Sequence, residues 1–550
     1  MSAPQANSSC IALVVGAGPV GLTMAAHLHH HGLACRIIDR SPTPSDKSKA
    51  LVLWGRSLEM LDNLGIVANF LSAGRFLNAA CLQDGHRVLA RIPFASTGTE
   101  YTKPLMLAQS ETERLLTEHL QRVGITIERA VELTAFTDHG DHILATLRHA
   151  DGRDESVRCA WLLGCDGAHS IVRKQVGLEF TGEAEPNDWI LADCRIAGPI
   201  PQDELSLFWH QKGVLAFFPF ADRCRVIADM GTARGTNHPA DPSLAEVQAI
   251  VDERGPAGVR LSDAHWLAGF RIHERKVADY RRGRAFLAGD AAHIHSPAGG
   301  QGMNTGMQDT WNLAWKLALV QTGRARPSLL DSYSQERGKV GEMVLRNAAR
   351  LTRVATLRNP IGQFFRNRVV GLLGHLSAFR RGFVRNLSEL NIHYPHSPLN
   401  GESRGTSWTA ESVHPGDRFP DTRLRESGTD QEHRLLSVLR GPQHNLLLLP
   451  ATVDAAVLAT LSDIRQRVET TYPNLIRVHL IVPGDSLSAV RDGFASVWLD
   501  SENSVRQLLG ARETALALLR PDGYLGYRGQ PPSWEGLHEY LDRSLIAHAG

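Results

Sequence analysis

The sequence is poor in features that would assign it to several large classes of protein. Its 59 lysines and arginines almost balance 58 aspartates and glutamates, so the net charge of +1 gives no basic field for nucleic acid. The seven cysteines form no CxxC pair and all precede residue 225, which favours reduced thiols over a disulfide framework. Residues 1–5 lack the basic start of a signal peptide. We expect a cytoplasmic protein with no bound metal and no nucleic-acid partner.

Only one stretch approaches the length of a membrane span. Ile11–Leu28 carries no formal charge over 18 residues, but glycines and a proline interrupt it at Gly16, Gly18, Pro19 and Gly21. Such punctuation is typical of a strand, a turn and a helix. No stable membrane insertion is therefore expected.

The same stretch opens a dinucleotide-binding fingerprint. A short apolar strand at 11–15 leads into the glycines Gly16, Gly18 and Gly21, and a helix follows. A second strand at 35–38 ends in Asp39, with Arg40 beside it. The glycines permit a tight turn and close approach of the backbone to a pyrophosphate, and the acid accepts from a ribose hydroxyl. The fingerprint alone does not separate FAD from NAD.

Two further acidic turns follow apolar strands later in the chain. Asp166-Gly167 comes after the strand at 162–165, and Gly289-Asp290 comes after the strand at 285–288. The second turn continues through a proline-stiffened, glycine-rich loop containing Pro297 to a helix that begins at about Gly302. A strand, an acidic turn and a helix start suit a polar cofactor. Arg56 at a helix start is a further candidate for its pyrophosphate.

Residues 189–266 change to short β-type segments, which predict a mostly antiparallel sheet able to cover an aromatic ligand. Its candidate pocket residues are Trp209, Phe217, Phe218 and Met230, although core packing explains each of them as well. The basic segment 358–385 predicts a helical pair that caps this layer, with membrane contact as the alternative. We expect domains at 1–185 with 270–350, at 186–269, at 351–400 and at 410–550.

These motifs resemble those of the FAD-dependent aromatic hydroxylases of the para-hydroxybenzoate hydroxylase type, the single-component (group A) flavoprotein monooxygenases. The pentachlorophenol and phenol hydroxylase branch is the most similar. The resemblance rests on the three turns and on the runs His295–Pro297, Gly302–Asn304 and Gly306–Asp309, and it covers residues 10–350.

The resemblance implies an α/β protein in which a Rossmann-like FAD-binding domain is interleaved with the antiparallel substrate domain. A thioredoxin-like C-terminal domain without cysteines would follow, with a structural or homodimer-forming role. The implied FAD-binding residues are Gly16, Gly18, Gly21, Asp39, Arg40, Arg56, Gln109, Asp166, Gly167, Gly289, Asp290, Gly302, Met303 and Asn304. Among them, Gln109 would lie along the ribityl chain and Asp290 would accept from a ribityl hydroxyl.

The implied reaction takes hydride from NADPH or NADH to FAD, and O2 then forms a C4a-hydroperoxyflavin that hydroxylates a phenolic ring. His210 is the candidate base that deprotonates the phenol, Arg275 a basic residue near the flavin ring, and Pro297 a loop residue facing the substrate. The amides at the start of the Gly302 helix would stabilise negative charge on the reduced flavin.

Two other readings use the same motifs. The substrate could be a polycyclic natural product or antibiotic, because the flavin chemistry is identical and only the pocket volume differs. A flavin-binding protein without monooxygenase turnover is the alternative of another class. A flavin halogenase is disfavoured, since the Trp-x-Trp-x-Ile-Pro motif is absent.

Overall fold

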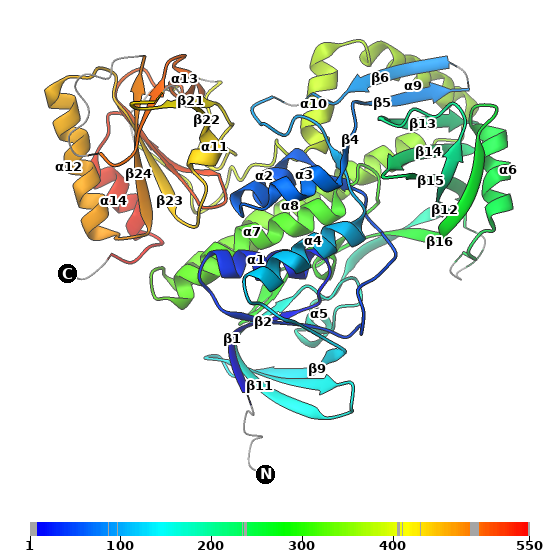
Figure 1. Ribbon diagram of the computed structural model, residues 1–550, viewed down its shortest axis with the longest axis horizontal. Coiled ribbons are helices and arrows are strands. Elements are labelled where there is room, and N and C mark those ends of the chain that lie inside the picture. The colour runs from blue at the N-terminus through cyan, green and yellow to red at the C-terminus, as the bar shows by residue number, and fades with distance from the viewer. Residues whose placement is uncertain are drawn as a thin grey trace.

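The computed structural model describes residues 8–85, 87–95, 97–233, 235, 239–403, 408–409, 411–429, 431–484 and 494–547. Within them the chain builds three eight-stranded sheets and one of three strands. Figure 1 shows the first sheet and its helices at the base, the second sheet at the upper right and the C-terminal sheet at the left. The small sheet joins β3 (Val52–Leu53), β7 (Leu105–Met106) and β4 (Arg75–Phe76), beside helices α2 (Gly55–Asn63) and α3 (Val67–Ala73).

The first sheet is parallel at its centre and runs in the order β17-β18-β11-β1-β2-β8. These strands are β17 (Arg281–Arg282), β18 (Ala285–Leu287), β11 (Asp154–Gly164), β1 (Ser8–Val15), β2 (Cys35–Asp39) and β8 (Ile127–Arg129), with the antiparallel β9 (Val131–Asp138) and β10 (Ile143–His149) attached. Helices α1 (Pro19–His30), α4 (Gln109–Arg122) and α7 (Gly302–Gln321) pack together over one face (Figure 1). Three of the strands, β1, β11 and β18, end directly before the glycine and aspartate turns, as the sequence predicts. This brings the turns at Gly16 and Asp290, about 270 residues apart in the chain, to one edge.

The second sheet is mostly antiparallel, in the order β19-β16-β12-β15-β14-β13-β5-β6. Its strands are β19 (His293–Ile294), β16 (Arg260–Lys276), β12 (Thr181–Ala197), β15 (Arg223–Thr232), β14 (Gly213–Phe220), β13 (Glu204–His210), β5 (Ala79–Asp84) and β6 (Arg87–Pro93), and helix α6 (Leu244–Arg254) covers one face. Strands β5 and β6 come from the segment expected in the first domain. They belong to the second sheet because β5 pairs in parallel with β13. No local sequence pattern predicts this pairing. Residues 79–93 therefore lie in the second sheet, apart from the rest of the segment expected at 1–185.

Three helices lie between the first sheet and the C-terminal sheet in the chain and pack against one side of the second sheet. Helix α8 (Asp331–Ala355) follows the short turn η2 (Pro327–Leu330), and α9 (Pro360–Leu373) and α10 (Ser377–Leu387) follow it. Helix α9 packs against β6, and α10 buries Val384 and Leu387 among Leu51, Trp54 and other apolar residues of the small sheet and its neighbours. The helical pair predicted at 358–385 is present.

The C-terminal sheet is mixed and has helices on both faces. Its order is β20 (Gly401–Glu402), β27 (Leu525–Gly529), β26 (Ala515–Leu519), β23 (His444–Leu449), β24 (Ile476–Pro483), β25 (Val497–Asp500), β21 (Arg423–Glu426) and β22 (Glu432–Arg434). One apolar core lies under α12 (Ala455–Thr471) and α14 (Trp534–Asp542), and the other under α11 (Leu435–Val438) and α13 (Ser504–Leu509). The predicted hairpin at 515–524 corresponds to β26 and β27. No helix in the described part of the chain is long and apolar enough to cross a membrane.

Candidate FAD and substrate site

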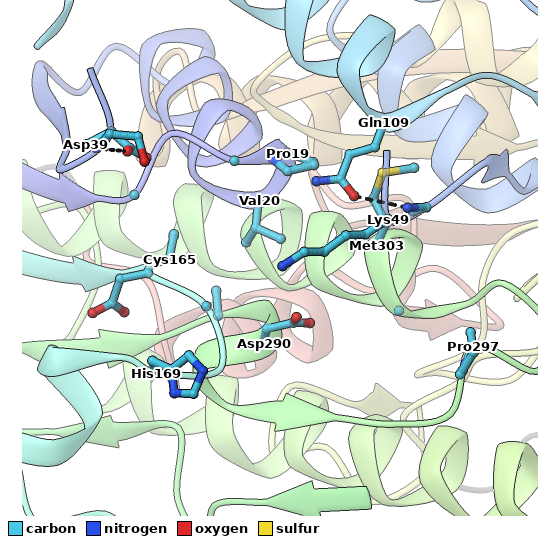
Figure 2. A pocket seen from close by; sticks show the side chains of 18 of the residues that line it. Pro19, Val20, Asp39, Lys49, Gln109, Cys165, His169, Asp290, Pro297 and Met303 are labelled. Atoms are coloured by element: carbon cyan, nitrogen blue, oxygen red, sulfur yellow. Dashed lines mark hydrogen bonds between the residues drawn. The ribbon is translucent and has the colours of Figure 1, made fainter. Parts of the chain in front are cut away.

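A cavity of about 510 Å³ lies where the edge of the first sheet meets the second sheet. Its volume is in the range of small-molecule sites. Figure 2 shows Asp39 toward one side of this cavity and Pro297 toward the other, with Asp290 between them. The predicted residues that line it are Gly16, Gly18, Asp39, Arg40, Gln109, Asp166, Gly167, Phe218, Asp290, Pro297, Gly302 and Met303.

The glycine turn after β1 leaves no room for side chains where it packs, and open space where a ligand would approach. A Cβ on Gly16 would lie 2.4 Å from the main-chain oxygen of Cys165, and one on Gly21 would lie 1.8 Å from that of Gly16. A Cβ on Gly18 would meet nothing within 4 Å. Gly18 therefore exposes backbone at the start of α1, where the helix dipole favours an anion.

Asp39 organises this turn from the end of β2. Its carboxylate accepts hydrogen bonds from the amides of Ala17 at 2.7 Å and Ser41 at 2.8 Å. Arg40 beside it is exposed at the cavity edge. The acid therefore both supports the glycine turn and borders the cavity, which fits the adenosine end of a dinucleotide.

Asp166 supplies an acceptor that the described residues leave unused. Its Oδ2 accepts from the amides of Ile171 at 2.7 Å and Val172 at 3.3 Å, whereas Oδ1 is buried without a hydrogen bond. Burial raises the pKa of this carboxyl, although the amide donors oppose the shift. Gly167 follows with a φ of 74°, in the left-handed region that favours glycine. A buried orphan acceptor on a cavity wall is typical of a site that receives a ligand donor.

The other end of the cavity brings a carboxylate, a cation and a helix start together. The Asp290 side chain is open to the cavity although its carboxylate lies deep in the protein, and this burial raises its pKa. Figure 2 shows the Lys49 side chain extending across the cavity toward Asp290. Gly302 and Met303 begin α7, whose first residues have no side-chain cap, so its amides are free to face a ligand.

The loop that carries Lys49 is anchored from the second sheet. Arg225 on β15 donates to the main-chain oxygens of Ser48 and of Lys49, the latter at 2.8 Å, and forms a doubly hydrogen-bonded pair with Asp193 at 2.7 Å. Gln109 accepts from the amide of Ala50 at 3.1 Å. This geometry fixes where the lysine enters the cavity.

Asn304 ties the glycine-rich loop to the neighbouring strand. Its side chain accepts from the Trp54 amide at 2.9 Å and donates to the oxygens of Val52 and Gly300. Asn304 is buried and does not line the cavity. Gly289 likewise lies behind the wall, where a Cβ would meet Val20 at 2.8 Å.

A charged network supports the Gly289 turn from behind. The Asp309 carboxylate accepts hydrogen bonds from the Gly289 amide at 3.0 Å and from the Arg337 guanidinium at 2.6 Å. It also pairs with Nε2 of His293 at 2.8 Å. Burial would raise the pKa of Asp309, but Arg337 and His293 together hold it below its ordinary value. His295 stacks on His293, and burial lowers its pKa to about 4, so the His295 ring is neutral at physiological pH.

Several predicted catalytic and pocket residues lie elsewhere. His210 sits at the turn between β13 and β14, where its Nδ1 accepts from the Lys212 amide at 3.2 Å. Arg275 lies within β16, paired with β19. Neither side chain lines the cavity, so we do not retain His210 as the base or Arg275 as a ring contact.

Of the four predicted pocket residues, only Phe218 lines the cavity. Alternate residues of β14 point to opposite faces, so Phe218 lines the cavity while Phe217 packs in the core beneath α6. Trp209 is buried below the guanidinium of Arg366, 4.1 Å from its ring centre. Met230 is 45% exposed and does not line the cavity.

Arg56 belongs to the contact with the C-terminal sheet and does not line the cavity. It is buried, donates to Glu59 at 2.9 Å and to the main-chain oxygen of Asp522 at 2.6 Å, and lies over the Trp311 ring. Its expected pyrophosphate contact is not supported by this position. Further charged or ionisable side chains that were not predicted also line the cavity, among them Lys49, Glu132, His169 and Arg225. His169 follows the predicted Asp166-Gly167 turn by two residues, whereas Lys49 and Arg225 follow no recognisable turn and only the tertiary fold brings them to the cavity.

Comparison with known proteins agrees with this geometry. The family described as "FAD binding domain" matches residues 9–348. The 6-methylpretetramide 4-monooxygenase of Streptomyces rimosus is 35% identical over 540 residues, which cover 96% of this chain and 92% of that protein. The chain belongs to the FAD-binding-domain family.

Two further proteins match this chain almost end to end. Pentachlorophenol 4-monooxygenase of Sphingobium chlorophenolicum is 29% identical over 556 residues, covering 99% of this chain and 98% of that protein. The crystal structure of CabE, an aromatic hydroxylase from angucycline biosynthesis, superposes with a TM-score of 0.76 at 28% identity, covering 98% of this chain and 99% of CabE. The match therefore includes the C-terminal sheet.

Proposed function

We propose that this protein is an FAD-dependent monooxygenase that uses NADPH or NADH and O2 to hydroxylate a phenolic ring within a fused-ring aromatic substrate. The observation that carries the proposal is a continuous cavity that joins the glycine and aspartate turns to an apolar wall on the second sheet, formed by Phe218 and Ile227. The 6-methylpretetramide, anhydrotetracycline and pentachlorophenol monooxygenases and the angucycline hydroxylase among its relatives support aromatic hydroxylation.

The residues present fit FAD along the whole cavity. Gly18 and the start of α1 would receive the diphosphate, Asp39 and Arg40 would border the adenosine, and Oδ1 of Asp166 would accept a ligand hydroxyl. At the other end Asp290 would accept a ribityl hydroxyl, with Lys49 opposite it. FAD supplies hydride acceptance from the nicotinamide and activation of O2, chemistry that protein side chains alone do not provide.

The protein contributes charge and enclosure at the reactive end. The uncapped amides at Gly302 and Met303 and the amine of Lys49 offer positive potential where reduction adds negative charge. Pro297 and the second sheet border that end, and α9 and α10 pack in the apolar cluster that contains Phe218. This enclosure would limit water, which competes with transfer of oxygen to the ring.

A fused-ring substrate is favoured over a single-ring phenol by the higher identity to the 6-methylpretetramide enzyme, 35% against 29% for the pentachlorophenol enzyme. The test is a panel of single-ring phenols and fused-ring phenols, scored for stimulated NADPH and NADH oxidation together with hydroxylated product by mass spectrometry. We expect product with a fused-ring phenol. Product only from single-ring phenols would contradict the substrate assignment. Bound FAD with neither stimulated oxidation nor product from any substrate would favour a flavin-binding protein without monooxygenase turnover.

We infer that residues 410–550 form a thioredoxin-like domain, supported by a mixed sheet with helices on both faces. Dithiol chemistry is unavailable to it because the last cysteine of the chain is Cys224. A structural or homodimer-forming role in the cytoplasm is proposed instead. Residues 1–185 and 270–350, less strands β5 and β6, form the FAD domain in this proposal.

A further inference from the structure

The helices α9 and α10 are held firmly on their inner side. Asn367 on α9 donates to Asp84 at 2.8 Å, and the guanidinium of Arg366 covers the ring of Trp209. Val370 packs in the apolar cluster that includes Val384 of α10. The orientation of α9 is therefore fixed, and its opposite side is a defined surface.

That opposite side is apolar and exposed. Ile361, Phe364, Phe365, Val369 and Leu372 recur at helical spacing along α9 and all are exposed, with Ile361 at 69% and Leu372 at 70%. Leu376 and Phe379 continue the exposed set into α10. Nine of the thirteen large hydrophobic side chains exposed in the described part of the chain lie between residues 354 and 379. A concentration of this kind marks an interaction surface rather than ordinary scatter.

The charge around this surface has one sign. Residues 343–388 contain nine arginines and no aspartate or glutamate, whereas the remainder of the chain carries a net charge of −8. Most of these arginines are exposed, including Arg350, Arg353, Arg381 and Arg385, and Arg368 lies within the apolar stripe over the Phe364 ring. The partner must therefore offer apolar contact and negative charge together.

We propose that the α9–α10 face adsorbs to an anionic lipid surface, with α9 lying in the plane of the interface. The apolar stripe would enter the boundary of the acyl chains while the arginines contact the headgroups. In a symmetric dimer formed through this face, the arginines of one copy would lie against the arginines of the other. Residues 343–388 contain no acid that could neutralise them, so self-association is disfavoured. The 14 residues of α9 are too few to span a bilayer, so the contact is peripheral.

The location gives this contact a consequence for substrate supply. The inner sides of α9 and α10 pack in the cluster that contains Phe218, a residue of the cavity wall. Docking of the outer side would place the apolar end of the cavity beside the membrane boundary, where aromatic compounds of low solubility accumulate. Lipid binding itself does not depend on the proposed reaction and is tested without it.

The test is co-sedimentation of the full-length protein with vesicles of phosphatidylcholine alone and of phosphatidylcholine with phosphatidylglycerol, at low and high salt. Binding to the anionic vesicles should exceed binding to the neutral ones by about tenfold at low salt and weaken as salt rises. The triple variant Ile361→Ser, Phe364→Ser, Leu372→Ser should reduce this binding by about tenfold or more. The double variant Arg381→Gln, Arg385→Gln should weaken binding to the anionic vesicles and reduce its salt dependence, because it removes two of the nine arginines.

Control variants test whether vesicle binding depends on the α9–α10 face or on any exposed apolar side chain. Phe76→Ser and Ile546→Ser alter exposed apolar residues outside the segment and should bind vesicles as the unaltered protein does. Melting temperatures verify that each variant is folded. The proposal is overturned if the unaltered protein binds neither kind of vesicle, or if the triple variant binds the anionic vesicles unchanged. A concentration-dependent dimer that the triple variant dissociates, without vesicle binding, would overturn it in favour of self-association.

Discussion

Arg225 on the second sheet donates to the main-chain oxygen of Lys49 at 2.8 Å, and through this bond a substrate-side strand fixes the loop whose lysine enters the cofactor cavity. The guanidinium can do so because Asp193 holds it by two bonds of 2.7 Å in a buried pair. The position of this proposed cofactor contact therefore depends on the integrity of the second sheet.

Arg225→Lys should weaken FAD binding by about tenfold and lower the free energy of unfolding by about 1–3 kcal/mol, because lysine cannot keep both the Asp193 pair and the two carbonyl bonds. Fluorescence titration with FAD and urea unfolding measure the two effects. Arg223→Lys on the same strand is the matched control, since Arg223 is partly exposed and bonds Asp263. Equal effects of the two substitutions would refute the anchoring role.

Asp290→Asn should act in opposite directions on stability and on cofactor binding. Burial raises the Asp290 pKa, so its ionised form costs the apoprotein stability above that pKa, and the cost disappears below the ordinary value of 3.8. The variant should melt no lower than the unaltered apoprotein at neutral pH, yet bind FAD about 10- to 100-fold more weakly through loss of a charged acceptor. A variant that retains FAD affinity would exclude Asp290 from the site.

Acid should destabilise the fold partly through His444. Burial and nearby Arg520 lower its pKa from 6.5 to about 3, so the unfolded chain takes up a proton over this interval before the folded chain does. The stabilising contribution is complete above pH 6.5 and is lost as pH falls toward 3. His444→Gln should reduce the pH slope of the unfolding free energy by about 1.4 kcal/mol per pH unit within the interval. Exposed His375→Gln is the control, and identical slopes for the two variants would contradict the assignment.

A buried ionic cluster should hold the C-terminal sheet against α7 and α8. The Glu336 carboxylate on α8 accepts two hydrogen bonds from the Arg520 guanidinium, at 2.6 and 2.9 Å, and one from the Lys316 ammonium on α7 at 2.8 Å. Glu336→Gln leaves the buried Lys316 without its carboxylate and Arg520 with Asp522 alone, and should cost about 3–5 kcal/mol in urea unfolding. Glu342→Gln on the same helix removes only the exposed pair with Arg346 and should change stability little. A small effect at Glu336 would show that the cluster does not secure the interface.

The parts of the site that sequence could predict are those written in consecutive residues. Gly16, Asp166 and Asp290 each follow a buried strand of the same sheet, so their turns meet at one edge in any parallel arrangement. Phe218 was proposed together with Phe217, but only the observed pleat of β14 separates the cavity face from the core face.

The parts that sequence could not predict depend on contacts between distant segments. Strand β5 joins the second sheet by pairing with β13, some 125 residues later, and no local pattern encodes that register. Lys49 is held at the cavity by the hydrogen bond from Arg225 to its main-chain oxygen. Arg56 lies only seven residues later but contacts the C-terminal sheet instead, through the main-chain oxygen of Asp522. A charged helix start looks the same in sequence whether it meets a phosphate or a protein carbonyl.

The most direct test of the account is FAD binding to the purified protein, measured by fluorescence titration for the unaltered chain, Asp290→Asn and Lys49→Met. The account predicts stoichiometric FAD in the unaltered protein and weaker binding in both variants, with less salt dependence for Lys49→Met because a cation is lost from the cavity. Failure of the unaltered protein to take up FAD, or unchanged affinity in both variants, would contradict the assignment of this cavity as the cofactor site.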